Sequence, residues 1–173
     1  MRRSVALIAT CLPFFAQAAW GDPSATPASY GEYAQSPEHF GAQLVLTPDE
    51  AQFVRVWGSS RAPLSLPSVD LVHRGSAVTA VLVFQGCTPD PSGKCDVVAD
   101  FSVLGPGGAY ISGGSGRLWS GGPMPGRLLL GDASMGLSFD ATDPIGQYRV
   151  IVTVKDRVSG QTLSLWSALK VVE

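Results

Sequence analysis

Two cysteines, Cys87 and Cys95, are the side chains whose type and spacing most clearly allow covalent chemistry. They bracket the loop 88–94, TPDPSGK, which is dense in turn-forming residues. A redox or metal-binding pair would favour CxxC spacing or a nearby histidine, and this part of the sequence has neither. The pair therefore predicts a structural disulfide in an oxidising compartment, which stabilises the fold by an amount toward the lower end of roughly 2–4 kcal/mol.

Histidine and serine residues give little support for catalysis. The chain has two histidines, His39 and His73, whereas a closed zinc site needs four ligands. The segment 132–136, DASMG, contains Ser134 but lacks the first glycine and the following helix of a nucleophile elbow. We expect both histidines to be solvated and 132–136 to be a turn, and we predict no catalytic residue.

Acidic residues are the next candidates. Asp132, Asp140 and Asp143 are close enough in sequence to meet a calcium ion at a loop end, but their spacing is not that of an EF-hand. Turn capping is the preferred interpretation. Asp100 is expected in the middle of a strand and facing outward, so no carboxylate pair for glycoside cleavage is indicated. The sequence predicts no metal site and no cofactor.

The segment with the most binding potential is 113–126, GGSGRLWSGGPMPG, which we expect to be the loosest loop of the domain. It carries Arg117, Trp119 and Met124, residue types that are enriched in protein interfaces, and loops of sandwich folds commonly bind partners. The alternative is that Trp119 is a strand residue that packs over an open sheet edge.

Trp166 is the fourth candidate binding residue, on the outward parity of the last predicted strand. Arg149, Thr153 and Lys155 share that face on the neighbouring strand. Trp166 therefore either covers a second apolar surface or is stacked by a cation.

A C-terminal β-hairpin positions these side chains and is the clearest structural signal in the sequence. Apolar residues occupy every second position of each strand, which is typical of a half-buried strand: Tyr148, Val150, Val152 and Val154 in the first, and Leu163, Leu165, Leu169 and Val171 in the second. Residues 156–160, DRVSG, predict the turn between them, because Gly160 can adopt a positive φ and Asp156 can bond its own backbone.

Upstream segments predict further short strands, at 41–46, 69–73, 76–85, 96–104, 109–112, 127–130 and 135–139. The strand 76–85 is apolar on both faces, which is typical of a central strand. The strand 96–104 is its expected partner, across the cysteine loop.

One short helix is predicted after the first of these strands. Thr47 as the N-cap, Pro48 at the first helical position and Glu50 completing a capping box indicate its start. Its inward residues are expected to be Ala51 and Val54, with Phe53 and Trp57 as further candidates. A strand over 53–57 is the alternative.

Composition favours an all-β protein. The chain has 173 residues, of which 45% are hydrophobic and only 15% are charged, with 20 glycines and 13 prolines. Low charge with many turn formers suits short strands in a sandwich. We predict an antiparallel β-sandwich of about 7–9 strands with one short helix. The net charge of −2 gives no basic footprint for nucleic acid.

The N-terminal residues 1–18 predict a secretory signal peptide. Two arginines precede an apolar run, 5–15, and an AQA motif ending at Ala18 fits a cleavage site. The run is too short to span a membrane, which needs roughly 20 apolar residues, so the mature chain is expected to have no transmembrane segment. Lipidation at Cys11 and twin-arginine export are the less favoured alternatives.

The next residues, 19–40, predict a flexible leader because prolines interrupt them and no periodicity is present. Its last third can dock on the domain through Tyr30, Tyr33 and Phe40. The domain itself is expected to span residues 41–173.

The stretch 143–150, DPIGQYRV, resembles the penultimate strand of immunoglobulin-like and macroglobulin-like sandwiches. The resemblance implies an immunoglobulin-like fold in which Tyr148 forms a tyrosine corner. Val150 stands where antibody-type domains have their second intersheet cysteine. More broadly, the segments VDLVHRG, AVTAVLVFQGC, KCDVVADFSVLGPGG and DPIGQYRV are similar to a group of uncharacterised secreted bacterial proteins, over roughly residue 69 to the C-terminus.

These observations predict a non-catalytic module, structural or protein-interacting, in the periplasm or outside the cell. Its expected partner is a protein of the cell envelope. The alternative is a small-molecule or carbohydrate-binding sandwich that uses the Trp119 loop, with Trp166 as a second stacking surface.

Overall fold

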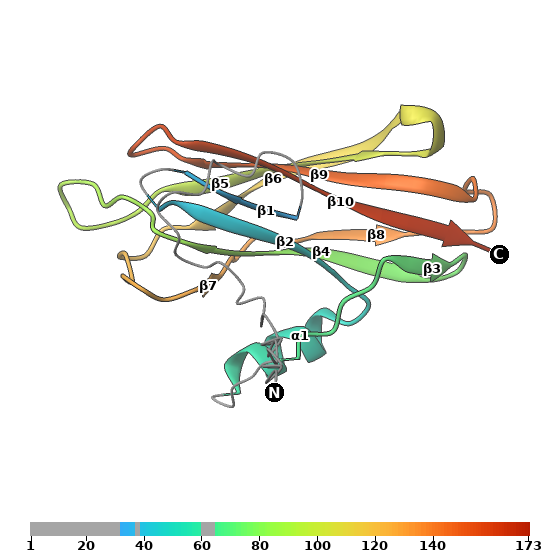
Figure 1. Ribbon diagram of the computed structural model, residues 1–173, viewed down its shortest axis with the longest axis horizontal. Helices are drawn as coiled ribbons and strands as arrows, with labels where there is room; N and C mark the ends of the chain where they lie inside the picture. Colours follow the sequence, from blue (N-terminus) through green and yellow to red (C-terminus); the bar gives the residue numbers. More distant parts are fainter. Residues whose placement is uncertain (1–31, 37–38, 60–64) are drawn as a thin grey trace, which may run out of the picture.

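Two β-sheets packed face to face make up the body of the protein (Figure 1). The computed structural model describes residues 32–36, 39–59 and 65–173. The first sheet contains β1 (Tyr33–Gln35), β2 (Gly41–Thr47), β4 (Ala77–Gln85), β7 (Leu129–Leu130) and β8 (Met135–Ser138). The second sheet has the order β3 (Leu71–His73), β10 (Thr162–Val172), β9 (Gly146–Asp156), β5 (Val97–Leu104) and β6 (Tyr110–Trp119). The predicted fold class, an all-β sandwich with one short helix, is confirmed, and the described residues form ten strands rather than the predicted 7–9.

The predicted C-terminal hairpin forms the centre of the second sheet. β9 and β10 pair antiparallel along their whole length, with Val152 opposite Leu165. Both strands alternate between buried and exposed positions. The odd-numbered leucines and Val171 of β10 line the space between the sheets, as their alternation predicted. They are joined there by four residues of β9: Tyr148, Val150, Val152 and Val154.

The first sheet is apolar on both faces because a helix covers its outer side. In β4, Val78, Ala80, Leu82 and Phe84 point into the sandwich. Val81 and Val83 lie on the opposite face, in a second cluster with Phe53. Phe53 belongs to α1 (Glu50–Gly58), which lies on the side of β2 and β4 away from the second sheet (Figure 1).

The helix begins later than its sequence pattern predicted. Thr47 still belongs to β2, where it pairs with Thr79, so it is not the N-cap. Asp49 takes that role, because its Oδ1 accepts a hydrogen bond from Gln52 N at 2.8 Å. The buried helical residue is Phe53, whereas Ala51 and Val54 are exposed.

β4 and β5 are not partners, contrary to the expectation from the sequence. β4 pairs with β2, β7 and β8 in the first sheet, and β5 pairs with β6 and β9 in the second. The loop between them therefore crosses from one sheet to the other. The predicted disulfide Cys87–Cys95 lies in this loop, with a Cα–Cα distance of 6.0 Å.

The segment 113–126 is not a loop throughout, because its first half belongs to β6. This strand pairs with β5 from Tyr110 to Trp119. Its glycines permit close packing: a Cβ on Gly113 would lie 2.6 Å from the Phe101 carbonyl oxygen. β6 is the last strand of its sheet and is exposed over most of its length.

Another departure from the prediction concerns β3, which pairs with β10 in parallel rather than antiparallel orientation. Leu71 lies opposite Lys170, and Val72 opposite Val171. β3 is an edge strand of the second sheet, within the range 69–73 that the sequence predicted as a short strand.

The first sheet reaches into the range predicted as leader. Tyr33–Gln35 forms β1 on β2, and Phe40 is fully buried. The predicted signal peptide 1–18, with Cys11, and the leader residues 19–31, with Tyr30, lie outside the described residues. No helix among the described residues is long and apolar enough to cross a membrane.

Candidate functional site

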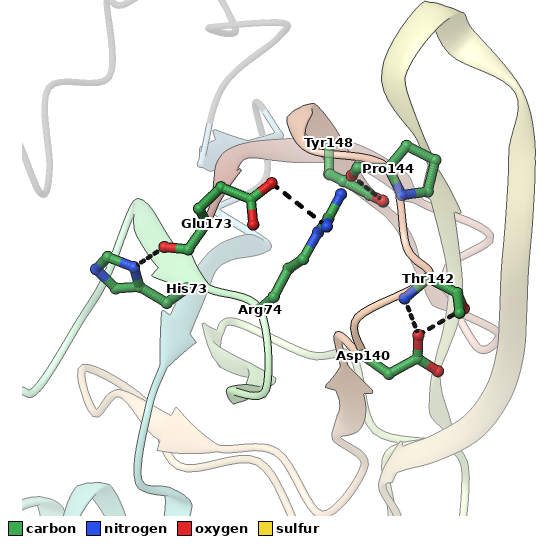
Figure 2. Close-up of polar contacts among 7 residues, drawn as sticks. All are labelled: His73, Arg74, Asp140, Thr142, Pro144, Tyr148 and Glu173. Carbon is green, nitrogen blue, oxygen red and sulfur yellow. Dashed lines mark hydrogen bonds and ion pairs between the residues drawn. The ribbon is translucent and has the colours of Figure 1, made fainter.

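The corner that precedes β9 is held by Tyr148 (Figure 2). Its hydroxyl donates a hydrogen bond to the carbonyl oxygen of Pro144 at 2.7 Å. The ring is buried and packs edge-on against Phe139, with 5.1 Å between ring centroids. Burial, followed by the nearby negative charge of Asp143, raises the pKa of Tyr148. This is the tyrosine corner that the resemblance implied, and its role is structural.

The substitution Tyr148→Phe is expected to lower the free energy of unfolding by about 0.5–1.5 kcal/mol, because the buried ring loses its hydrogen bond to the Pro144 carbonyl. Urea unfolding followed by tryptophan fluorescence measures the loss. Tyr110→Phe is the matched control, since Tyr110 is 67% exposed, and should change stability by less than about 0.5 kcal/mol. Equal losses in the two variants would contradict a structural role for the Tyr148 hydroxyl.

The acidic residues near this corner cap turns, as predicted. Asp140 accepts hydrogen bonds from the backbone N–H and the hydroxyl of Thr142 (Figure 2), and Asp143 accepts one from Asp140 N. The Thr142 hydroxyl, and next its N–H, lower the pKa of Asp140. This stabilisation is therefore present near neutral pH and is lost as the pH falls through the lowered pKa. No group of three or more metal-ligating side chains occurs in the described part of the chain.

The histidines and the serine considered for catalysis each contact other residues and not one another. The imidazole Nδ1 of His73 contacts the carbonyl oxygen of Glu173, whose carboxylate pairs with Arg74 at 3.4 Å (Figure 2). His39 is exposed, and Ser134 donates a hydrogen bond to Glu50 Oε1 at 2.8 Å. These contacts are typical of exposed polar side chains and do not form a catalytic arrangement.

Trp119 lies at the end of β6 and faces the space between the sheets. Its ring packs at a tilt against Phe84, with centroids 6.1 Å apart, and it adjoins the main core. The indole Nε1 donates a hydrogen bond to the Gly122 carbonyl at 3.2 Å. Trp119 thus supports the loop that follows β6, in agreement with its alternative interpretation as a strand residue.

The other two residues of the predicted loop site are more accessible. Met124 is 41% exposed. Arg117 lies on the outer face of β6, where its Nε is 3.8 Å from Asp96 Oδ1. Asp96 also pairs with Arg157, at 3.7 Å. Arg117 and Arg157 therefore share the carboxylate of Asp96.

Trp166 lies on the outer face of the second sheet, opposite Ile151, whereas Trp119 faces inward. The two tryptophans cannot form one platform. The Arg149 guanidinium stacks over the Trp166 ring, with its Cζ 4.6 Å from the ring centroid, so the sequence-based alternative of a stacked cation describes this residue. A cavity of about 380 Å³ lies beside them.

Sequence reasoning missed Tyr110 and Ile111, which are 67% and 49% exposed at the start of β6. Both lie on the terminal strand of the sheet. Both residues belong to the short strand predicted over 109–112. The glycines that follow gave no strand pattern, so the full length of β6 and its exposed edge were not predicted.

Comparison with known proteins gives distant similarities only, since no family model and no curated protein matches the chain. A CARDB domain from Pyrococcus furiosus in complex with di-metal ions is 13% identical, with 60% of this chain and 80% of that chain covered and a TM-score of 0.38. An immunoglobulin-like protein from Pseudomonas aeruginosa is 12% identical, with coverage of 75% and 91% and a TM-score of 0.34. A family 123 glycoside hydrolase from Clostridium perfringens is 10% identical and has a TM-score of 0.44, and the match covers 78% of this chain but 27% of that enzyme. Similarities at this level concern the fold alone.

Proposed function

We propose that this protein is a secreted, non-catalytic interaction module of the periplasm or the cell exterior, and that its protein partner adds a strand to the free edge of β6. The observation that carries the proposal is the exposed edge of this ten-residue strand, with which no described strand pairs on its outer side. A strand edge presents unpaired N–H and C=O groups, which an extended segment of another chain can satisfy.

The side chains of β6 favour this use. Natural proteins usually protect a free edge with proline, lysine or a covering segment. β6 contains no proline and no lysine, and its single charge, on Arg117, is paired with Asp96. Tyr110 and Ile111 add exposed apolar surface at one end of the strand. Small residues, SGGSG at 112–116, leave room for a second backbone to approach.

In this proposal, two of the predicted loop residues contact the partner and the third supports the loop. Arg117 on β6 and the exposed Met124 in the loop after β6 contact the partner, whereas Trp119 holds the loop in place through Gly122. We favour a protein partner over a small molecule at the Trp119 loop because that ring already packs against Phe84. The disulfide is compatible with an oxidising compartment, which supports the proposed secretion.

The test introduces a lysine into the edge. Ile111→Lys is expected to reduce recovery of the partner in pull-downs from periplasmic extract by about tenfold or more, since each 1.4 kcal/mol of lost binding is a factor of ten. Val158→Lys is the matched control, because Val158 is an apolar residue with 37% exposure in the β9–β10 turn. It should leave recovery unchanged.

Two outcomes would contradict the proposal. One is equal recovery of every captured protein by the wild type and both variants. The other is enzymatic turnover that Ser134→Ala abolishes, since a catalytic serine is incompatible with a non-catalytic module.

A further inference from the structure

We propose that the cavity beside Trp166 and Arg149, on the outer face of the second sheet, binds an extended acidic peptide segment through its carboxylates. This inference rests on the proposed function, because it assigns a protein ligand. It concerns the outer face of the sheet rather than the β6 edge, although the Ile111 side chain of β6 lies next to Gly105 in the wall of the cavity.

Strand register places the guanidinium at the centre of this face. Arg149 on β9 lies opposite Ala168 on β10 and opposite Leu104 on β5. Trp166 lies two residues before Ala168 on the same face, and its ring supports the guanidinium at 4.6 Å. Stacking on an aromatic ring limits the motion of an arginine side chain, so that its planar donor edge is held ready for a ligand.

The cavity has room for a side chain and its flanking backbone. Its volume is about 380 Å³, and Gln147, Arg149 and Trp166 supply polar and aromatic groups to its wall. The other side is the turn η1 (Pro106–Gly108). A Cβ added to Gly107 or Gly108 would meet no atom within 4 Å, so the backbone of this turn is open to a ligand.

Charge identifies the ligand as an anion. Arg74 pairs with Glu173, and both Arg117 and Arg157 pair with Asp96. Among the described residues, no carboxylate lies within ion-pair distance of Arg149. An arginine that is oriented but unpaired is suited to a bidentate bond with a carboxylate.

A second cation near Arg149 favours an extended peptide with two carboxylates over a ligand that carries a single negative charge. Lys170 lies opposite Gln147 on the same outer face, which makes it the diagonal neighbour of Arg149, at about 7–8 Å. It too has no ion pair among the described residues. Alternate side chains of an extended peptide are spaced by about 6.6–6.8 Å, so two acidic residues separated by one residue match the two cations. Because Arg149 covers the free face of Trp166, stacking of a sugar ring there is disfavoured.

The experiment titrates the purified protein with the peptide acetyl-Ser-Glu-Ser-Glu-Ser-amide and with its glutamine analogue, at low salt. The side-chain N–H signal of Trp166 in NMR spectra reports binding at the site, and that of Trp119 reports the integrity of the fold. Because the bonds to Arg149 are charge-assisted, the acidic peptide is expected to bind at least about tenfold more tightly than the analogue. Added salt should weaken this difference.

Two variants decide the assignment. Arg149→Gln should reduce affinity for the acidic peptide by about tenfold, whereas Arg157→Gln, which removes an arginine already paired with Asp96, should retain wild-type affinity. Equal affinity for the two peptides, or equal losses in the two variants, would overturn the proposal. Arg149→Gln leaves the β6 edge unaltered and should retain wild-type recovery of the partner in pull-downs, so failure of the edge and failure of this site are distinguishable.

Discussion

Asp156→Ala is expected to lower the free energy of unfolding by about 3 kcal/mol, since hydrogen bonds to a charged group are each worth roughly 1.5–3 kcal/mol and are not fully additive. Asp156 is the last residue of β9 and is completely buried. One carboxylate oxygen accepts from Thr88 N at 2.9 Å and from the Ser159 hydroxyl at 2.8 Å, and the other accepts from Val158 N at 3.1 Å.

These bonds explain why so large an effect is expected from a turn residue. The sequence indicated that Asp156 would bond its own turn, which Val158 and Ser159 confirm. The bond from Thr88 adds a connection to the disulfide loop, far away in the sequence. Removal of the carboxylate takes the acceptor from three donors in two segments, and the hairpin turn separates from the loop that joins the two sheets.

Thermal and urea unfolding test this prediction. For a domain of this size, a loss of about 3 kcal/mol corresponds to a decrease in Tm of roughly 10 °C. Asp156→Asn keeps one acceptor oxygen and should lose less than the alanine variant. Asp140→Ala, at an exposed turn, is a control for loss of a carboxylate cap. An Asp156→Ala variant as stable as Asp140→Ala would show that the buried network contributes little.

Gly86→Ala is expected to cost about 3 kcal/mol or more, because the substitution combines backbone strain with a steric clash. Gly86 has a φ of 76°. A Cβ at this position would lie 2.2 Å from the His39 carbonyl oxygen and 2.8 Å from its carbonyl carbon. Both contacts are with backbone, so relief requires the segment before β2 to move away from the end of β4.

Gly93→Ala separates the two contributions. Gly93 has a φ of 82°, close to that of Gly86, but its Cβ would meet no atom within 4 Å. It should therefore show the strain alone, about 1–2 kcal/mol. Chemical denaturation of both variants gives the difference. If the two losses are the same, the close approach of His39 has no energetic consequence.

The sequence predicted the parts of the fold in which side chains alternate. β9, β10 and the buried face of β4 follow directly from their apolar periodicity, and the corner residue Tyr148 was identified from its motif. Two misassignments have physical causes. β4 and β5 are neighbours in sequence, yet each finds its hydrogen-bonding partners in a different sheet. Thr47 resembles a helix cap, but pairing with Thr79 keeps it in β2.

Only some residues of the candidate site could be predicted from the sequence. The outward parity of Trp166 and its relation to Arg149 followed from the strand pattern. The free edge at Tyr110 did not, because the glycines of β6 give no alternation and hold their place through backbone bonds to β5. Which carboxylate meets which arginine, as in the pairing of Arg117 with Asp96, depends on three-dimensional proximity that no local pattern encodes.

The parallel pairing of β3 with β10 has a consequence for the timing of folding during synthesis. Leu71 and Val72 find their backbone partners in Lys170 and Val171, which the ribosome adds about a hundred residues later. At roughly 5–20 residues per second, the nascent β3 waits several seconds without its partner strand. Closure of the second sheet therefore cannot precede synthesis of β10, and ribosome-bound chains truncated before β10 should remain sensitive to protease.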